Sequence, residues 1–306
     1  MKSFLRIAVT LLLLGLISAA VFYFNPLWVH DQQIRYRLWH SNVRSKTISV
    51  DSHRLHYFEA LPPDGSPGTP LVLIHGLGSR GEDWSPMIPA LAAAGFHVYV
   101  PDLLGYGRSS KPDLEYSVPI EEVVVVDFMR ALDLTHADLD GWSMGGWIAA
   151  TIALDHPAMV DRLVLDDSAG LTYQPSFPRT AFVPTDAATL ASLQALLTPH
   201  PATLPPFVVR ATLRRIASEG KIIQQSMDSM ESGADLLDTR LARIVQPTLI
   251  VWGSEDKLIP IAVGEEFHHG IPNSVFAAIP ACGHLAPAEC PKPVLAATIP
   301  FLKAER

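Results

Sequence analysis

The segment Gly141-Trp142-Ser143-Met144-Gly145-Gly146 constrains the fold of this 306-residue chain more than any other feature. It follows a short segment with apolar residues at 137 and 139 and precedes a small-residue stretch, 145–154, that predicts a helix. Strand, sharp turn and helix form the context of a G-x-S-x-G nucleophile elbow, in which the serine has a strained backbone conformation. The flanking glycines are then required, because a Cβ there would collide with neighbouring backbone. We expect Ser143 to present its hydroxyl above a sheet, at the positive end of the following helix.

Two downstream loops carry the residue types that would activate such a serine. Residues 247–252 predict a buried strand, which is followed by a glycine and by a loop with Asp256. A second short strand at 275–279 precedes His284. A serine hydroxyl is a poor nucleophile at neutral pH, so an imidazole must accept its proton and a carboxylate must orient that imidazole. The partners therefore follow Ser143 in the order acid and then histidine, as a nucleophile elbow requires.

These assignments have competing interpretations. Ser143 could be an ordinary helix N-cap, and His284 could be a surface histidine, since the chain has twelve histidines. The acid could be the adjacent Glu255, or one of Asp166 and Asp167, which follow an earlier strand. The two glycines and the order of the partners favour the catalytic interpretation and the later acid, Asp256.

A tetrahedral intermediate also needs preorganised donors for its negative oxygen, and these are commonly backbone amides. Met144 directly follows the serine and supplies one candidate amide. The second should come from the loop after an early strand, and residues 71–78, Leu-Val-Leu-Ile-His-Gly-Leu-Gly, fit that place. Because His75 and Gly76 make the turn there, we expect the amide of Leu77 to complete the oxyanion hole.

Together these motifs resemble those of the α/β-hydrolase superfamily, in particular its serine esterase and lipase branch. The resemblance covers residues 71–285 and rests on five segments in order: 75–78, 102–109, 141–146, 252–256 and 283–284. The form Gly-Trp-Ser-Met-Gly-Gly is similar to bacterial lipases and to monoacylglycerol-lipase-like enzymes. The resemblance implies an α/β fold with a mostly parallel central sheet, flanking helices and a helical cap inserted over the active site.

The expected activity is hydrolysis of carboxylic esters, above all lipid or acylglycerol esters, through an acyl-enzyme on Ser143 and without a cofactor. Epoxide hydrolases and haloalkane dehalogenases of this fold use an aspartate nucleophile, so the serine argues against both. Two other chemistries of the serine branch stay open, namely C–C bond hydrolysis of aromatic ring-cleavage products and cofactor-free perhydrolysis. A non-catalytic binding protein of the same fold also stays open.

Short apolar runs alternate with helical segments, which indicates a sheet covered on both faces. Residues 47–50 and 55–58 predict an early hairpin, while 84–94 and 119–132 predict helices. The alternation stops at residue 171. The predicted segments are an N-terminal anchor or signal segment 1–28, a connector 29–45, a first core part 46–170, a cap 171–237 and a second core part 238–306.

The predicted cap, residues 171–237, carries seven prolines and no clear strand. Apolar stripes near residues 190–197 and 208–216 predict two helices. Most of these side chains should pack on the core, and a minority could line an acyl pocket. The candidates for that pocket are Phe177, Phe182, Met227 and Met230.

The N-terminal segment has an uncharged run of eighteen residues, 7–24, after Lys2 and Arg6. As a helix it would span roughly 27 Å, close to the hydrocarbon thickness of a bilayer. A signal peptide would be cleaved near Ala20, which would give a secreted or periplasmic protein. Because the apolar run continues past Ala20, we favour an uncleaved single-pass signal anchor with its basic end in the cytoplasm. Either alternative places the catalytic part outside the cytoplasm.

The net charge of −8 argues against nucleic acid and leaves a small-molecule ester or lipid substrate as the expected partner. His268-His269 is the only close histidine pair, and we interpret it as solvated surface, so we expect no metal. Cys282 and Cys290 flank His284 and would bridge in an oxidising compartment if the geometry allows it. The oligomeric state and the acyl chain length are left open.

Overall fold

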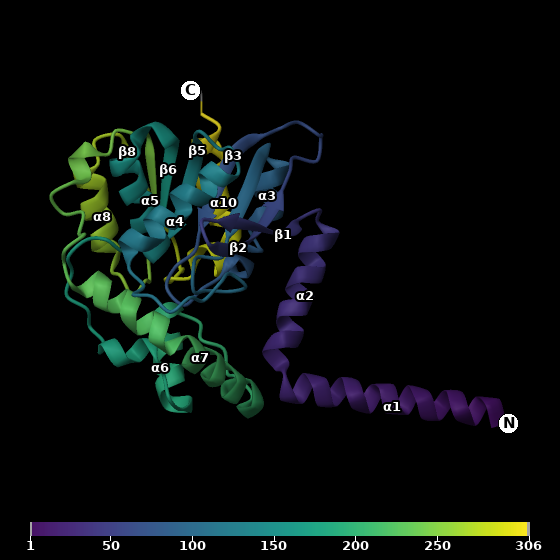
Figure 1. Ribbon diagram of the computed structural model, residues 1–306. Helices are drawn as coiled ribbons and strands as arrows, with labels where there is room; N and C mark the ends of the chain where they lie inside the picture. The colour runs from purple at the N-terminus through teal and green to yellow at the C-terminus, as the bar shows by residue number, and fades with distance from the viewer. Residues whose placement is uncertain (1, 305–306) are drawn as a thin grey trace.

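A computed structural model describes residues 2–304; Met1, Glu305 and Arg306, from the first and last predicted segments, lie outside the described residues. Its centre is an eight-stranded sheet in the order β1-β2-β4-β3-β5-β6-β7-β8 (Figure 1). Strand β2 is antiparallel to both its neighbours, and the remaining pairs are parallel, so the mostly parallel sheet expected from the sequence is confirmed. The strands are β1 Arg44–Val50, β2 His53–Ala60, β3 Thr69–Ile74, β4 Phe96–Pro101, β5 Ala137–Trp142, β6 Val160–Asp166, β7 Thr248–Gly253 and β8 Ser274–Ile279.

Helices cover both faces of this sheet because the central strands are apolar on both sides. In β3, Leu71 and Leu73 face one hydrophobic cluster and Val72 and Ile74 face the other. Helices α4, α5 and α8 pack on one face, while α3 and α10 pack on the opposite face. The core helices are α3 Ile88–Ala93, α4 Val118–Ala131, α5 Met144–Asp155, α8 Ile261–Gly270, α9 Ala286–Glu289 and α10 Pro291–Leu302, with 3-10 turns η1 Gly81–Trp84, η2 Pro157–Met159 and η4 Leu241–Arg243.

The helix predicted over residues 84–94 is wrong in its extent. The chain forms the short turn η1 and then begins α3 only at Ile88. Pro89 lies in the first turn of α3. Proline is tolerated there because backbone N–H groups in the first turn have no partner within the helix. By contrast, the predicted helix 119–132 is confirmed as α4, whose first turn is capped by the hydroxyl of Ser117 accepting from the amide of Ile120 at 3.3 Å.

Between β6 and β7 the chain leaves the sheet and forms two helices, α6 Ala187–Leu197 and α7 Pro206–Glu231, with the 3-10 turn η3 Arg179–Phe182. They lie at the end of the molecule where the parallel strands finish (Figure 1). Asp186 begins α6 by accepting from the amide of Thr189 at 2.8 Å, and Leu190 and Leu193 are buried. The two predicted helices are therefore present, and α7 runs well beyond its predicted stripe.

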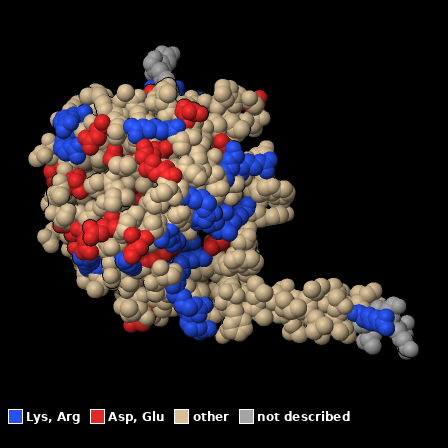
Figure 2. Space-filling view, viewed as in Figure 1, with Lys and Arg blue, Asp and Glu red and all other residues tan. Residues whose placement is uncertain are grey.

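The N-terminal segment forms two helices, α1 Lys2–Phe24 and α2 Pro26–His40, so the predicted boundary at residue 28 falls inside α2. Among the described residues, no single helix has the length and apolar character needed to cross a membrane. Residues Val9–Phe24 and Pro26–His40, bent by 103°, meet that test only as a pair. Figure 1 shows α1 projecting from the body, and Figure 2 shows it free of charge over most of its length.

Candidate active site

Ser143 lies at the turn between β5 and α5, with φ 58° and ψ −122°. This positive φ is rare for a residue with a side chain. A Cβ on Gly141 would overlap the carbonyl of Gly145, and a Cβ on Gly145 would overlap the carbonyl of Ile74. The amide of Ser143 donates to the carbonyl of Asp166 at 2.9 Å, which fixes the turn against β6. The strained serine between obligatory glycines, predicted from the sequence, is confirmed.

The structure brings Ser143, His284 and Asp256 into one hydrogen-bonded chain. Nε2 of His284 lies 2.9 Å from Oγ of Ser143, and its Nδ1 lies 2.8 Å from Oδ2 of Asp256. All three residues are buried. The other oxygen of Asp256 accepts from the amides of Leu258 at 2.8 Å and Ile259 at 3.0 Å. Because that oxygen is already held by the backbone, Oδ2 is left to face the imidazole.

The alternative acids do not contact the imidazole. Glu255 is exposed. Asp166 lies against Asp140 of the neighbouring strand, and burial raises its pKa to about 7. Asp167 accepts from the amide of Gly253 at 2.7 Å and lies beside Asp256. Burial, reinforced by the charge of Asp256, raises the pKa of Asp167 well above its ordinary value, so it is held as the neutral acid.

Two contacts that support this site were not predicted from the sequence. Asp167 lies beside the carboxylate of Asp256. Its position directly after a strand was the only feature of the sequence that pointed to this role. Trp142, the residue between the glycine and the serine of the elbow, donates from its indole nitrogen to the carbonyl of His284 at 2.7 Å. The strand that carries the nucleophile thus also holds the backbone of the histidine.

The loop after β3 meets the start of α5 at the serine. The position of a Cβ on Gly76 would be 2.9 Å from the Cβ of Ser143, so only glycine lets the loop approach this closely. Leu77 follows in that loop, and Met144 is the buried first residue of α5. His75 accepts from the amide of Leu103 at 3.0 Å, and burial lowers its pKa, which keeps the ring neutral. Both predicted oxyanion residues therefore adjoin Ser143.

Two cavities meet at Ser143. The first, which we call the polar chamber after its charged groups, has a volume of about 300 Å³. Its wall combines His284 and the polar residues Ser79, Arg80, Asp83, Arg215 and Glu219 with apolar side chains, among them Leu193, Leu197, Ile216 and Ile223. The second, which we call the apolar chamber, has a volume of about 380 Å³. Leu77, Ser143, Phe182 and Leu258 border both chambers. All four side chains that the sequence offered for an acyl pocket line the apolar chamber: Phe177, Phe182, Met227 and Met230.

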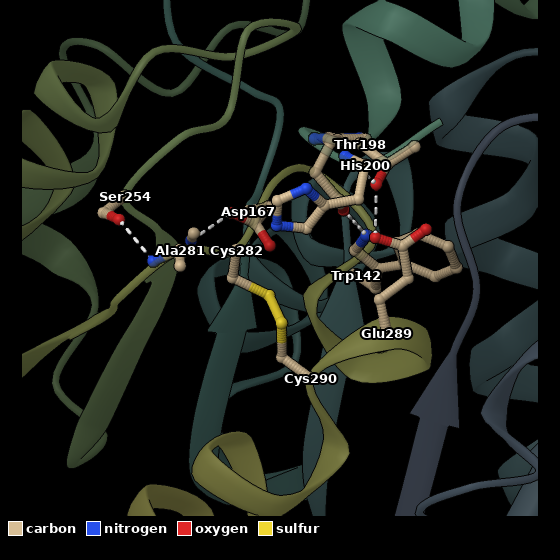
Figure 3. Close-up of a disulfide and its surroundings, with 11 residues drawn as sticks. Trp142, Asp167, Thr198, His200, Ser254, Ala281, Cys282, Glu289 and Cys290 are labelled. Atoms are coloured by element: carbon tan, nitrogen blue, oxygen red, sulfur yellow. Dashed lines mark hydrogen bonds between the residues drawn. A yellow bond between two sulfur atoms is a disulfide. The ribbon is translucent and has the colours of Figure 1, made fainter. Parts of the chain in front are cut away.

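A disulfide encloses the histidine loop. Cys282 and Cys290 are joined, so the pairing left open by the sequence is present in the structure (Figure 3). Glu289, next to Cys290, accepts from the hydroxyl of Thr198 at 2.6 Å, and Thr198 ends helix α6 of the cap. The loop that carries His284 is thus closed by the disulfide and linked to the cap by the hydrogen bond from Thr198.

A serine at a strained elbow, linked through a histidine to a carboxylate, is the arrangement by which serine hydrolases activate their nucleophile. Within the described residues, no group of three or more His, Cys, Asp or Glu side chains is placed to hold a metal ion. The family model for the alpha/beta hydrolase fold matches residues 69–290, and the chain belongs to that family.

The similar proteins include C–C bond hydrolases and lipases. The chain is 31% identical to a 2-hydroxy-6-oxo-6-(2'-aminophenyl)hexa-2,4-dienoic acid hydrolase of Metapseudomonas resinovorans, over 77% of this chain and 84% of the relative. It is 28% identical to Lipase 3 of Moraxella sp. strain TA144, over 88% of each chain. Among solved structures, a membrane phospholipase A described as a bacterial virulence factor superposes with a TM-score of 0.81 at 26% identity, over 99% of this chain and 98% of the other.

Proposed function

We propose that the protein is a serine hydrolase of carboxylic esters, with lipid or acylglycerol esters as its substrates. The observation that carries this proposal is the hydrogen-bonded chain from Ser143 through His284 to Asp256. In the first step His284 accepts the proton of Ser143 as its oxygen attacks the ester carbonyl. Asp256 keeps the imidazole in the required tautomer and stabilises the imidazolium that forms.

The amides of Leu77 and Met144 are proposed as donors to the oxyanion, because both residues adjoin the serine and backbone amides are already oriented before the reaction. His284 then protonates the departing alcohol, which leaves an acyl group on Ser143. Water enters, His284 takes its proton, and the acid is released. The apolar chamber, with its methionines and phenylalanines, suits the acyl chain.

The test is hydrolysis of a p-nitrophenyl ester series from acetate to palmitate by the full-length chain and by Ser143→Ala. Removing the nucleophile is expected to lower turnover by roughly four to six orders of magnitude. The chain-length optimum would then report the size of the apolar chamber. A variant that kept near-full activity would show that Ser143 is not the nucleophile.

A second candidate function is hydrolysis of a C–C bond in dienoic acids, and the similarity to the Metapseudomonas dienoic acid hydrolase favours it. Such a substrate brings a carboxylate of its own. At this site the arginines of the polar chamber are already paired with acidic side chains, which supports a neutral ester instead. Incubation with a dienoic ring-cleavage product, followed by its loss of absorbance, compares the two activities directly.

We also propose that α1 anchors the protein in a membrane, with the catalytic part outside the cytoplasm. The support is the exposure of its apolar side chains, among them Phe4, Leu11, Leu13 and Leu16, each more than half exposed. A disulfide in the catalytic part accords with an oxidising compartment. The alternative, cleavage near Ala20, would release a shortened chain, which the mass of the mature protein would reveal.

A further inference from the structure

The two chambers at Ser143 differ in a way that assigns a part of the substrate to each. His284 borders the polar chamber and is not among the described residues that line the apolar chamber. In ester hydrolysis the histidine delivers its proton to the oxygen of the departing alcohol. The alcohol must therefore lie on the side of His284, in the polar chamber, and the acyl chain in the apolar one.

A residue of the N-terminal helix α2 pairs with the arginines that line the polar chamber. Asp31 of α2 is buried, with 7% of its surface exposed. Its carboxylate accepts from both terminal nitrogens of Arg215 in the cap helix α7, at 2.7 Å and 3.3 Å. The same carboxylate lies 3.9 Å from Nη1 of Arg80, which follows the oxyanion loop. A planar, bidentate pair of this kind is geometrically specific.

These contacts set the charge of the chamber. Two cationic side chains, Arg80 and Arg215, lie against the carboxylate of Asp31, and the charge of Asp83 also acts on Arg80. Glu219 is already occupied by Lys111, at 3.0 Å, from outside the chamber. The positive and negative charges at the alcohol side are thus matched, and one of the negative charges is contributed by a helix outside the hydrolase core.

We propose that Asp31 is a specificity-determining residue that neutralises the arginines of the polar chamber, so that the site takes the neutral, hydroxyl-bearing alcohol part of an ester. The proposal rests on the proposed ester hydrolysis. A neutral polyol such as glycerol can exchange hydrogen bonds with paired ions without adding a charge to a partly buried site. An anionic alcohol part would have to compete with Asp31 for the same guanidinium groups.

The experiment measures kcat/KM of the full-length protein in neutral detergent micelles on two substrates with the same acyl chain. One is a 1-monoacylglycerol and the other is the corresponding 1-acylglycerol 3-phosphate. The readout is the ratio of the two kcat/KM values, phosphate over neutral, because a general loss of activity cancels in it. Asp31→Asn removes one negative charge and leaves one positive charge in excess, and we expect the ratio to rise about ten-fold.

A compensating variant tests whether Asp31 acts through its charge or only by supporting the local structure. Asp31→Asn combined with Arg215→Gln removes one charge of each sign, and we expect its ratio to return to within about three-fold of the wild-type value. The matched control is Asp113→Asn, which removes an exposed ion pair with Lys221 on the same helix α7 and should not move the ratio.

Three results would overturn the inference. A ratio for Asp31→Asn within about two-fold of wild type would show that Asp31 does not set selectivity. A double variant whose ratio stayed as high as that of Asp31→Asn would show that charge matching is not the cause. If the wild-type chain showed no Ser143-dependent hydrolysis of the monoacylglycerol, the proposed ester hydrolysis itself would be wrong.

Discussion

Asp256 and Asp167 lie side by side, yet the proposed mechanism requires a charged Asp256 while burial raises the pKa of Asp167. Asp256 must carry the negative charge that faces His284, whereas Asp167 is held as a neutral acid by burial and by the charge of its neighbour. Only a charged group can stabilise the imidazolium, while a neutral one can still hydrogen-bond. Replacing each aspartate by asparagine therefore removes a required charge at one position and only a neutral acid at the other.

We predict that Asp256→Asn lowers kcat by roughly 10³- to 10⁴-fold, because an amide supplies no charge to the imidazolium. Asp167→Asn should lower kcat by less than about ten-fold, since an amide reproduces the shape of a protonated carboxyl group and can still accept from Gly253. The measurement is ester turnover by both variants at neutral pH. Equal losses in the two would mean that the acid has been misassigned.

A second prediction concerns the pH dependence of stability. Burial raises the pKa of Glu121 to about 8, while one of its oxygens accepts from the amide of Leu104 at 3.1 Å. The pKa of a glutamate in the unfolded chain is about 4.3. Between this pKa and that of the folded state, the folded protein holds a proton that the unfolded chain releases. Stability from this group is therefore complete at low pH and is lost as the pH rises through about 8.

Glu121→Gln removes that titration and keeps an acceptor for Leu104. The difference in Tm between this variant and wild type should become more positive from pH 5 to pH 9, as followed by thermal denaturation. Glu115→Gln, at an exposed position nearby, is the control and should give a constant difference. A constant difference for Glu121→Gln as well would contradict the assigned proton.

At the scale of elements, the loop that carries His284 is stabilised by the Cys282–Cys290 disulfide, which closes a loop of eight positions. Cross-links of this kind restrict the unfolded chain and are worth about 2 kcal/mol for so short a loop. Replacing both cysteines by alanine should lower Tm by roughly 3–6 °C. It should also lower kcat, because His284 lies inside the closed loop. Thiol reductant should act on wild type and leave the double variant unaffected; sensitivity of the double variant would contradict this account.

The strands and the elbow could be predicted because their signals are local. Each buried strand is a short apolar run, and Gly141 and Gly145 mark a turn that needs nothing from elsewhere in the chain. The interruption between η1 and α3, at residues 85–87, and the full length of α7 were not predicted. Apolar spacing indicates which face of a helix is buried, but it does not show where the exposed turns of the helix begin and end.

The polar chamber could not be predicted, because its residues come from distant parts of the chain. Asp31, Arg80 and Arg215 each look like ordinary surface charges in the sequence. Only the packing of α2 against α7 and the oxyanion loop brings them together. The disulfide was undecided for a related reason, since two cysteines reveal a pair only when their separation in space is known.

At the scale of the whole molecule, α1 is a projecting helix with exposed apolar side chains, in a chain whose net charge is −8 (Figure 2). Near the end of α1, Phe22 and Tyr23 contact Phe207 of the cap. An apolar surface of this extent is unfavourable in water and favourable in lipid. Helix α1 thus ends against the cap helix that borders both chambers.

We predict that the full-length protein floats with neutral phospholipid vesicles in a density gradient. Leu13→Lys combined with Leu16→Lys places two charges in the apolar helix and should move the protein to the unbound fraction. Val275→Lys is the matched control, because it charges an exposed apolar residue of the catalytic part and should leave flotation intact. A wild-type protein that stays unbound would contradict the anchor.

The close packing around the elbow also has a consequence for how such a protein can diversify. At Gly141, Gly145 and Gly253 an added methyl group would overlap main-chain carbonyls, and no side-chain rearrangement can make room for it. The cap, by contrast, lines the apolar chamber with methionine and phenylalanine side chains, which tolerate exchange. We therefore expect inherited variation that changes substrate preference to accumulate in the cap and in α2, which contacts the cap. The residues of the reaction centre should stay unchanged. A randomised library should return functional clones in the same uneven pattern.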